Sequence, residues 1–340
     1  RVRRALVAAL AALACAAAQV EHKCYFRAWY KDGFGDQLKN AFLCFYLSLY
    51  LPHLGYFDEV ATRHFNKLPG PEQEAMRNVF SWVLPFTPLP PELLALETHH
   101  GKDYCGADHS CATQTLVVNC PVCKPPVDRS ECGRRLPEVR SHLNYTYLML
   151  PRREKKQVVA HVRRGDAKYR HHPEAFFERL IKHAVADLEP GSFEITIVTN
   201  GNLRSMDFGG APYRTFNGNL LESFRLMVNA DRFVGSHSSL SYVTTFMSPT
   251  LERAYMPWYL GLSACFPPTT TYFDLCPPYD PIPDPESDAD LQVERERLTH
   301  AAYHDFEAAA CARRALNLTG GGGRHEARTA SPDELRPPPG

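Results

Sequence analysis

Apolar residues in the second half of the chain alternate between short runs typical of buried strands and longer segments with helical spacing. The pattern predicts strands at residues 158–162, 193–199, 213–216, 231–234 and 252–256. It predicts helices between them, at residues 172–188, 219–229 and 238–247. Strands that alternate with helices in this way indicate a mostly parallel sheet with right-handed crossovers.

The first half of the chain opens with a similar unit. A strand is predicted at residues 24–30, a glycine-containing turn at 31–36 and an apolar helix at 37–51. Mixed helical material follows at residues 58–82, and a Pro- and Cys-rich stretch at 85–132 contains one further strand, at 115–119. We therefore predict an α/β fold of two Rossmann-like domains, at residues 24–151 and 157–278, with a helix within residues 288–317 and a disordered tail at 320–340.

The composition limits the classes of partner. The 340 residues carry 38 basic and 38 acidic side chains, and this balance argues against a general affinity for nucleic acid. Residues 1–20 begin with Arg-Val-Arg-Arg and continue as a short apolar run. This pattern is typical of a signal peptide or a type II signal anchor, so we expect the protein in the secretory pathway, in the Golgi or ER lumen.

Cysteine usage fits that compartment. Five of the 11 cysteines lie between residues 105 and 132, where Cys120-Pro-Val-Cys123 also resembles a zinc motif. Behind a secretory segment, disulfide bonds are the favoured interpretation. Asn144 and Asn317 each begin a glycosylation sequon.

Three polar turns, each between a predicted strand and a predicted helix, are the candidate sites of chemistry. The most informative is His161-Val-Arg163-Arg164-Gly-Asp166, which follows a buried strand. Open α/β sheets bind ligands where such strands end, and adjacent arginines can hold a diphosphate through forked, charge-assisted hydrogen bonds. The alternative is an exposed basic loop in which Asp166 pairs with a neighbouring arginine.

The other two turns contain small residues. Gly33-Phe-Gly35-Asp36 would let the backbone approach a ligand closely, although it lacks the third glycine of the dinucleotide motif. Gly235-Ser236-His-Ser238-Ser239 would present hydroxyl and backbone donors to a phosphate. A tight turn and a simple helix cap are the respective structural alternatives.

In their order along the chain, the three turns resemble the motifs of the fucosyltransferase superfamily with the GT-B fold, which includes α1,2-, α1,6- and protein O-fucosyltransferases. The resemblance covers residues 157–258 and, more weakly, residues 24–51. It implies two Rossmann-like domains facing a cleft, and transfer of fucose from GDP-fucose to a glycan or glycoprotein acceptor with inversion.

The resemblance also implies roles for individual residues. Arg163, with Arg164 second, would bind the β-phosphate, and Asp166 would orient the arginines or contact the nucleotide. His161 belongs to the same motif, and Ser236, Ser238 and Ser239 to the phosphate-binding turn. Gly33, Gly35 and Asp36 would face the fucose and the acceptor. Asp36 departs from the asparagine common in the family, and the aromatic pair of the α1,2 branch is absent after the serine turn.

The general base is open among His171, His172, Glu174 and Asp36. No metal ion or other cofactor is expected, since the single Asp-x-Asp, at residues 288–290, is typical of a helix start. Three alternatives remain: a transferase of the same fold with another nucleotide sugar, an inactive glycan-binding homologue, and a disulfide-rich adhesion protein.

Overall fold

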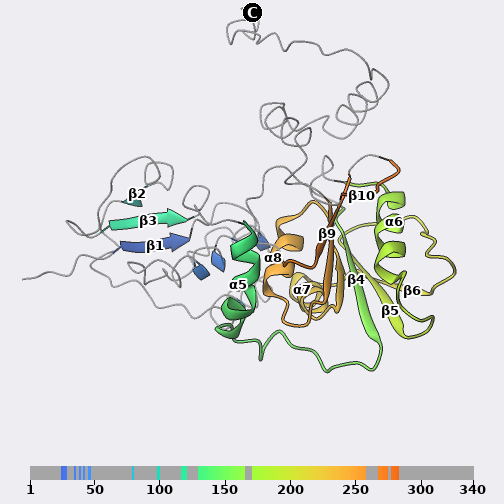
Figure 1. Cartoon of the computed structure of the whole chain (residues 1–340), viewed down its shortest axis with the longest axis horizontal. Coiled ribbons are helices and arrows are strands. Elements are labelled where there is room, and N and C mark those ends of the chain that lie inside the picture. The colour runs from blue at the N-terminus through green and yellow to red at the C-terminus, as the bar shows by residue number, and fades with distance from the viewer. Residues whose placement is uncertain are drawn as a thin grey trace, which may run out of the picture.

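A seven-stranded sheet organises the second half of the chain in the computed structural model (Figure 1). The structure describes residues 24–28, 34–35, 38–39, 41–42, 45–46, 79, 98–99, 116–120, 129–164, 171–257, 267–274 and 277–282. The strands of this sheet are β4 (Lys156–Val162), β5 (Phe193–Thr199), β6 (Tyr213–Phe216), β7 (Arg232–Val234), β8 (Arg253–Pro257), β9 (Thr270–Phe273) and β10 (Pro281–Ile282). Their order is β10-β9-β8-β7-β4-β5-β6, and only β10 runs antiparallel to its neighbour.

This order reverses direction at one place. After β4 the chain adds β5 and β6 on one side, and it then returns to add β7, β8 and β9 on the other side. The reversal falls between β4 and β7, which pair in parallel with Ala160 opposite Val234. In doubly wound sheets the loops that follow two such strands diverge and leave a crevice between them.

Helices cover both faces of the sheet, and the alternation of side chains along β4 fits this arrangement. Val158, Ala160 and Val162 pack with buried residues of α6 (Glu174–Val185). Val159 packs on the opposite side, with buried residues of α7 (Leu220–Val228) and α8 (Ser239–Met247). The strand is therefore buried on both faces, as its nearly continuous apolar sequence requires.

The amino-terminal part contributes a smaller sheet and helical segments. Strands β1 (Cys24–Ala28), β3 (Leu116–Cys120) and β2 (Thr98–His99) pair in parallel in that order. The helical residues Phe34 and Phe42 pack against the core over α7 and α8, with their rings 5.7 Å from Phe224 and 5.6 Å from Phe246. These helical residues thus belong to the same core as the seven-stranded sheet.

Helix α8 is fixed at its carboxyl-terminal end by residues from an earlier segment. Arg140, in the last turn of α5 (Arg129–Ser141), donates to the carbonyl oxygens of Phe246 at 2.7 Å and Thr245 at 2.6 Å. The Tyr145 hydroxyl donates to the Met247 carbonyl at 2.6 Å, and burial raises the pKa of Tyr145, so this group stays protonated. A cation at this end complements the helix dipole.

The predicted α/β class is confirmed, and each strand and helix predicted from residue 158 to 256 is present within three residues of its expected bounds. Beyond residue 256, β9 and β10 extend the sheet and were not predicted. These strands have four and two residues, so they carry little apolar periodicity. Helix α5, which is polar and contains Pro137, and the two-residue β2 were not predicted.

Several predictions concern residues outside the described ranges. They include residues 1–20, the helix within 288–317, the tail at 320–340 and the side chains of all 11 cysteines. The domain boundaries and the disulfide bonds stay predictions. Phe34 and Gly35 are helical, whereas the sequence predicted a turn up to residue 36 and a helix only from residue 37.

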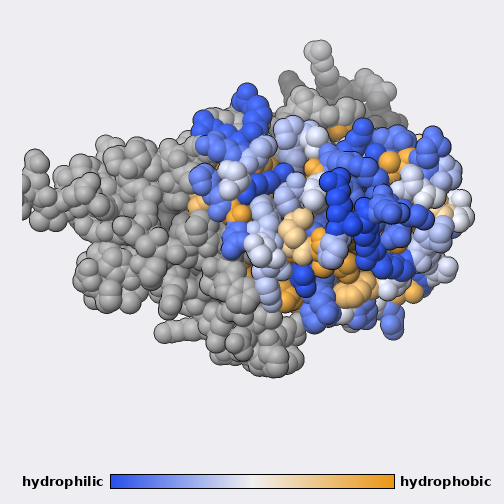
Figure 2. Space-filling view, turned by 90° about the horizontal axis from the view of Figure 1, so that it is seen from below, coloured by the Kyte–Doolittle hydropathy of each residue, from blue (hydrophilic) through white to orange (hydrophobic). Residues whose placement is uncertain are grey.

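The described surface is ordinary in its polarity. Seen from below, it carries mostly hydrophilic side chains with small apolar patches between them (Figure 2). Asn144 of the first sequon is exposed on this part of the chain. None of the helices within the described ranges is long and apolar enough to cross a membrane.

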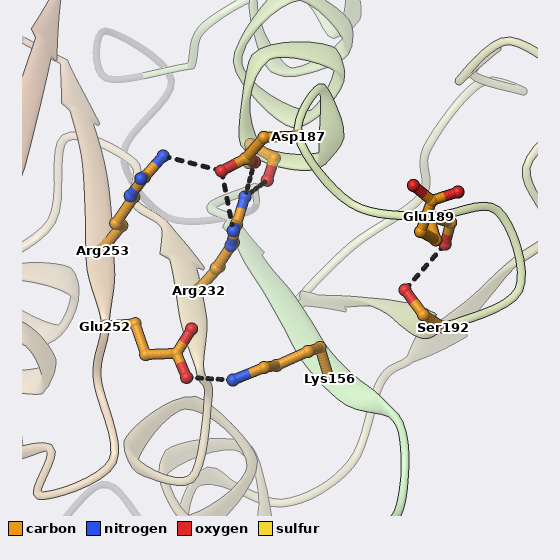
Figure 3. Close-up of polar contacts among 8 residues, drawn as sticks. Lys156, Asp187, Glu189, Ser192, Arg232, Glu252 and Arg253 are labelled. Carbon is orange, nitrogen blue, oxygen red and sulfur yellow. Dashed lines mark hydrogen bonds and ion pairs between the residues drawn. The ribbon is translucent and has the colours of Figure 1, made fainter.

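Ion pairs at the amino-terminal edge of the seven-stranded sheet connect its strands to the end of α6 and to one another (Figure 3). Arg232, at the start of β7, is buried and donates to both the Ala184 carbonyl and the Asp187 carboxylate just beyond α6. Arg253 of β8 donates to the same carboxylate at 3.0 Å. Lys156 of β4 pairs with Glu252. These contacts fix α6 to β7 and β8 at the edge opposite the crevice.

We expect Asp187→Asn to destabilise the fold at neutral pH but not in acid. Hydrogen bonds from Arg232, together with the charges of Arg232 and Arg253, lower the pKa of Asp187 to about 2. An aspartate in an unfolded chain titrates near a pKa of about 3.9, so the stabilisation is complete above that pH and is lost as the pH falls toward 2.

Urea unfolding at pH 7 and at a series of values below 4 measures this. The matched control is Glu189→Gln, which changes a neighbouring exposed carboxylate. The same loss of stability for Asp187→Asn at every pH would contradict the role of the ion pair.

Candidate functional site

The crevice between β4 and β7 collects two of the three turns singled out in the sequence. His161 to Arg164 leave the carboxyl end of β4, and Gly235 to Ser239 leave the carboxyl end of β7 and enter α8. Because β4 and β7 are parallel neighbours, both loops emerge at the same edge of the sheet. This edge, at the reversal of strand order, is where open α/β sheets bind ligands.

His161 connects the two loops through buried hydrogen bonds. Its side chain falls on the same face of β4 as Val159, which is the face that α8 covers. His161 Nδ1 lies 2.7 Å from Ser241 Oγ and 3.4 Å from Ser236 Oγ. The Ser236 backbone N–H also donates to Ser241 Oγ, at 3.0 Å. All three side chains are buried.

His161 stays neutral in this environment. Burial, and the nearby Arg163 guanidinium, lower the pKa of His161 to about 3. A residue with this pKa does not accept a proton near pH 7, so His161 acts here as a neutral hydrogen-bonding group and not as a general base.

Arg164, the second of the two adjacent arginines, is engaged in contacts within the protein. Arg164 turns toward α6, where its guanidinium lies 3.3 Å from a Glu174 oxygen and 5.9 Å from the centre of the Phe177 ring. Its backbone N–H donates to Asn200 Oδ1 at 2.6 Å, and its side chain donates to the Arg163 carbonyl at 3.0 Å. Neighbouring residues of an extended chain point to opposite sides, so Arg164 braces the loop on the α6 side.

Arg163 follows the carboxyl end of β4. It is half-buried, and its positive charge contributes to the low pKa of His161. Because neighbouring residues of an extended chain point to opposite sides, we expect Arg163 on the side of β4 that α8 covers. Both arginines were predicted to contact phosphate, with Arg163 first, and this role stays a prediction.

Two of the proposed bases lie at the start of α6. Glu174 is paired with Arg164; burial acts to raise its pKa, but its own backbone hydrogen bond and Arg164 lower the pKa on balance. An ion-paired carboxylate with a low pKa is a weak base. His172 is buried, with its ring 4.5 Å from that of Phe176. His171, a third candidate, is half-buried just before α6.

The serine turn caps and opens α8. Ser238 is the N-cap residue, and its Oγ accepts the Leu240 N–H at 3.3 Å. Ser239 is the first residue of the helix and is half-buried. The partial positive charge of a helix start thus lies at the crevice.

The glycine turn from the amino-terminal part meets the start of the same helix. A Cβ atom on Gly35 would lie 2.5 Å from the Leu240 backbone nitrogen and 2.9 Å from its Cα. Gly35 was predicted to face a ligand, and the structure supplies a different reason for the glycine, namely close contact with the α8 backbone. Gly33, Asp36 and Asp166, the remaining predicted site residues, lie outside the described ranges.

Sequence reasoning missed the residues that join the turns. Ser241 lies one helical turn after Ser238, so its position on the buried face of α8 was the available signal. Asn200 follows β5, and the expected parallel pairing of β5 with β4 could have indicated that it lies beside the loop after β4. His237 is buried with its ring stacked 6.4 Å from His172, a contact that depends on how α6 and α8 meet.

A cavity of about 460 Å³ lies elsewhere, at the amino-terminal edge of β4, β7 and β8. Residues 149–157 form one wall of it, and Asn229, Asp231 and Glu252 contribute to the rest. Open α/β sheets bind ligands at the carboxyl ends of their strands, which is the edge opposite this cavity. Within the described part of the chain, no cluster of three or more His, Cys, Asp or Glu side chains is arranged to hold a metal ion.

No family model and no curated protein matches this sequence. Among solved structures, the E. coli heptosyltransferase WaaC with ADP is similar at 13% identity and a TM-score of 0.41, covering 82% of this chain and 100% of its own. Glycosyl transferase family 9 from Veillonella parvula is similar at 8% identity and a TM-score of 0.40, covering 88% and 99%. POFUT1 in complex with GDP is similar at 10% identity and a TM-score of 0.34, covering 70% and 99%. At these values the similarities do not by themselves indicate what this chain binds or catalyses.

We expect Gly35→Ala to destabilise the protein and to displace the start of α8. The added methyl group would overlap the Leu240 backbone, which cannot move without moving the helix, and overpacking of this kind typically costs about 1–3 kcal/mol. Urea unfolding measures the loss.

Gly235→Ala is the matched comparison. Its added methyl group would meet the end of the Met256 side chain, which can rotate away, so we expect a smaller loss. Equal stability of Gly35→Ala and wild type would show that Gly35 does not contact α8.

Proposed function

We propose that the protein is a glycosyltransferase whose nucleotide-sugar donor binds in the crevice between β4 and β7. One observation carries the proposal: the β4 loop with Arg163 and the serine turn that starts α8 leave the same edge at the reversal point of a doubly wound sheet. A guanidinium and a helix start both favour a phosphate group, and this edge of the sheet is the usual place for a nucleotide.

The donor we propose is GDP-fucose, and the acceptor a glycan or glycoprotein in the secretory pathway. The order of the three turns, with its resemblance to the fucosyltransferase motifs, supports this choice over other nucleotide sugars. The contacts of His161 with Ser241 and Ser236, and the close approach of Gly35 to Leu240, support the assignment of the three turns to one site.

The chemistry of such a transfer places negative charge where the positive groups lie. The acceptor hydroxyl forms a bond to C1 of the sugar as the bond from C1 to the β-phosphate oxygen breaks, and the electron pair leaves with the diphosphate. Arg163 and the start of α8 would stabilise this growing charge. Arg164 acts through the loop, since its guanidinium is held by Glu174 and Phe177.

The proton of the acceptor hydroxyl requires a base with an accessible lone pair. His161 and Glu174 are poor candidates because the pKa of each is lowered. Asp36 and His171 remain the proposed candidates from the sequence.

A thermal-shift titration of the full chain with GDP, UDP, ADP and GDP-fucose tests the donor site. A ligand that binds only the folded state stabilises it by about 2.7 kcal/mol at one hundred times its Kd. Stabilisation by GDP and GDP-fucose alone is the expected result. A preference for UDP or ADP would indicate a different nucleotide-sugar donor. No response to any nucleotide would favour a glycan-binding homologue without transferase activity.

We expect Arg163→Ala to abolish most of that stabilisation and to lower turnover of the donor. Loss of one preorganised donor to a developing anion typically costs about 100- to 1,000-fold in kcat. Arg152→Ala is the matched control, because Arg152 is exposed on the loop at the opposite edge of the sheet. Equal turnover of Arg163→Ala and wild type would contradict the phosphate-binding role.

We further expect a chelator such as EDTA to leave transfer unchanged. If Arg163 and the helix start supply the positive charge, a divalent ion is not needed to neutralise the leaving diphosphate. The assay compares initial rates of sugar transfer before and after dialysis against EDTA. A requirement for added Mn²⁺ would place the protein in a different mechanistic class of transferases.

A further inference from the structure

Ser241 is the point at which three parts of the crevice meet. Its Oγ, fully buried in α8, lies 2.7 Å from Nδ1 of His161 on β4. It accepts the backbone N–H of Ser236, which follows β7, at 3.0 Å, and it lies 3.3 Å from the Ser236 hydroxyl. One hydroxyl group therefore connects the ends of both central strands with the helix that starts between them.

The hydrogen atoms at this hydroxyl can be counted. The Ser236 backbone N–H can only donate, so it occupies one lone pair of Ser241 Oγ. Ser241 has a single proton to donate, and its closest partner is His161 Nδ1. A separation of 2.7 Å is usual for a bond that a hydroxyl donates and short for one that a ring N–H donates. The distances thus favour donation from Ser241 to His161.

This direction determines which ring nitrogen of His161 carries a proton. The ring is neutral, because it is buried beside the Arg163 guanidinium. A neutral imidazole has one N–H, and an Nδ1 atom that accepts a hydrogen bond leaves that proton on Nε2. His161 is then a hydrogen-bond donor of fixed position and no charge.

We propose that Ser241 is a positioning residue that holds His161 as its Nε2–H tautomer, and so supplies a neutral donor beside Arg163 in the crevice. What that donor binds rests on the proposed function: a diphosphate oxygen accepts such a bond. The tautomer itself does not depend on the proposed function, so the two can be tested separately.

The first experiment reads the tautomer directly. Two-bond ¹⁵N–¹H correlation spectra of the full chain with ¹⁵N-labelled histidine, recorded near pH 7, distinguish the two neutral tautomers by the different shifts of protonated and unprotonated ring nitrogens. The chain has 15 histidines, so the spectrum of His161→Gln identifies the His161 signals. An unprotonated Nδ1 and a protonated Nε2 are the expected result. A protonated Nδ1 in the wild type would overturn the proposal without any variant of Ser241.

The second experiment compares Ser241→Ala with Ser248→Ala. Ser248 is the matched control, since it is equally buried at the opposite end of α8 and donates to the Val228 carbonyl at 2.6 Å. We expect Ser241→Ala to convert the His161 signals to a mixture of tautomers, and Ser248→Ala to leave them unchanged. An unchanged His161 tautomer in Ser241→Ala would also overturn the proposal.

A titration with GDP links the tautomer to binding. We expect Ser241→Ala to weaken GDP binding by about tenfold, the ratio that corresponds to one ordinary hydrogen bond, and Ser248→Ala to leave it unchanged. Failure of the wild type to bind GDP would count against the proposed donor and leave the tautomer result standing. If Ser241→Ala does not fold, the wild-type spectrum still decides the proposal.

Discussion

The parallel pairing of β4 with β7 is the constraint on which the site depends. Successive strands are added to one side of β4 and then to the other, so the loops after β4 and β7 leave the same edge in different directions. Without this pairing, His161 and Ser241, which are 80 residues apart, would have no reason to meet. Val159 and Phe233 lie opposite each other in the pair and are buried, so the burial of apolar side chains holds the strands in this register.

Helix α8 connects the crevice to the segments that contain Gly35, Arg140 and Tyr145. Its start lies at the crevice and is packed against Gly35, while its end is held by Arg140 and Tyr145. The helix is buried along most of its length, with polar residues such as Thr244 and Thr245 bonded back to its own carbonyl groups. A helix held at both ends and on its sides presents its dipole in a fixed direction, which is what an anion-binding site requires.

Several polar side chains of the crevice are engaged in contacts within the protein. Arg164, Glu174 and Asn200 form a brace between the β4 loop and α6. Burial lowers the pKa of His161, and the charge of Arg163 lowers it further. The crevice thus combines the positive charge of Arg163 with a neutral histidine ring.

The sequence by itself determined the α/β class, most strands and helices of the second half, and the three turns where chemistry was expected. Apolar periodicity, glycine turns and N-cap residues such as Asn219 and Ser238 are local signals, so they can be read without knowing the contacts. The short strands β9 and β10 and the polar helix α5 were not predicted, because none of them has a clear apolar periodicity of its own.

Only the tertiary structure decided what the side chains of the turns do. Two adjacent arginines look equivalent in the sequence, and their separation depends on which face of the sheet each one reaches. Gly35 is required by the Leu240 backbone, a residue about two hundred positions away, which no local pattern can indicate. The central position of Ser241 likewise follows from strand order, because hydrogen bonds between distant segments form only where the packing of the core brings those segments together.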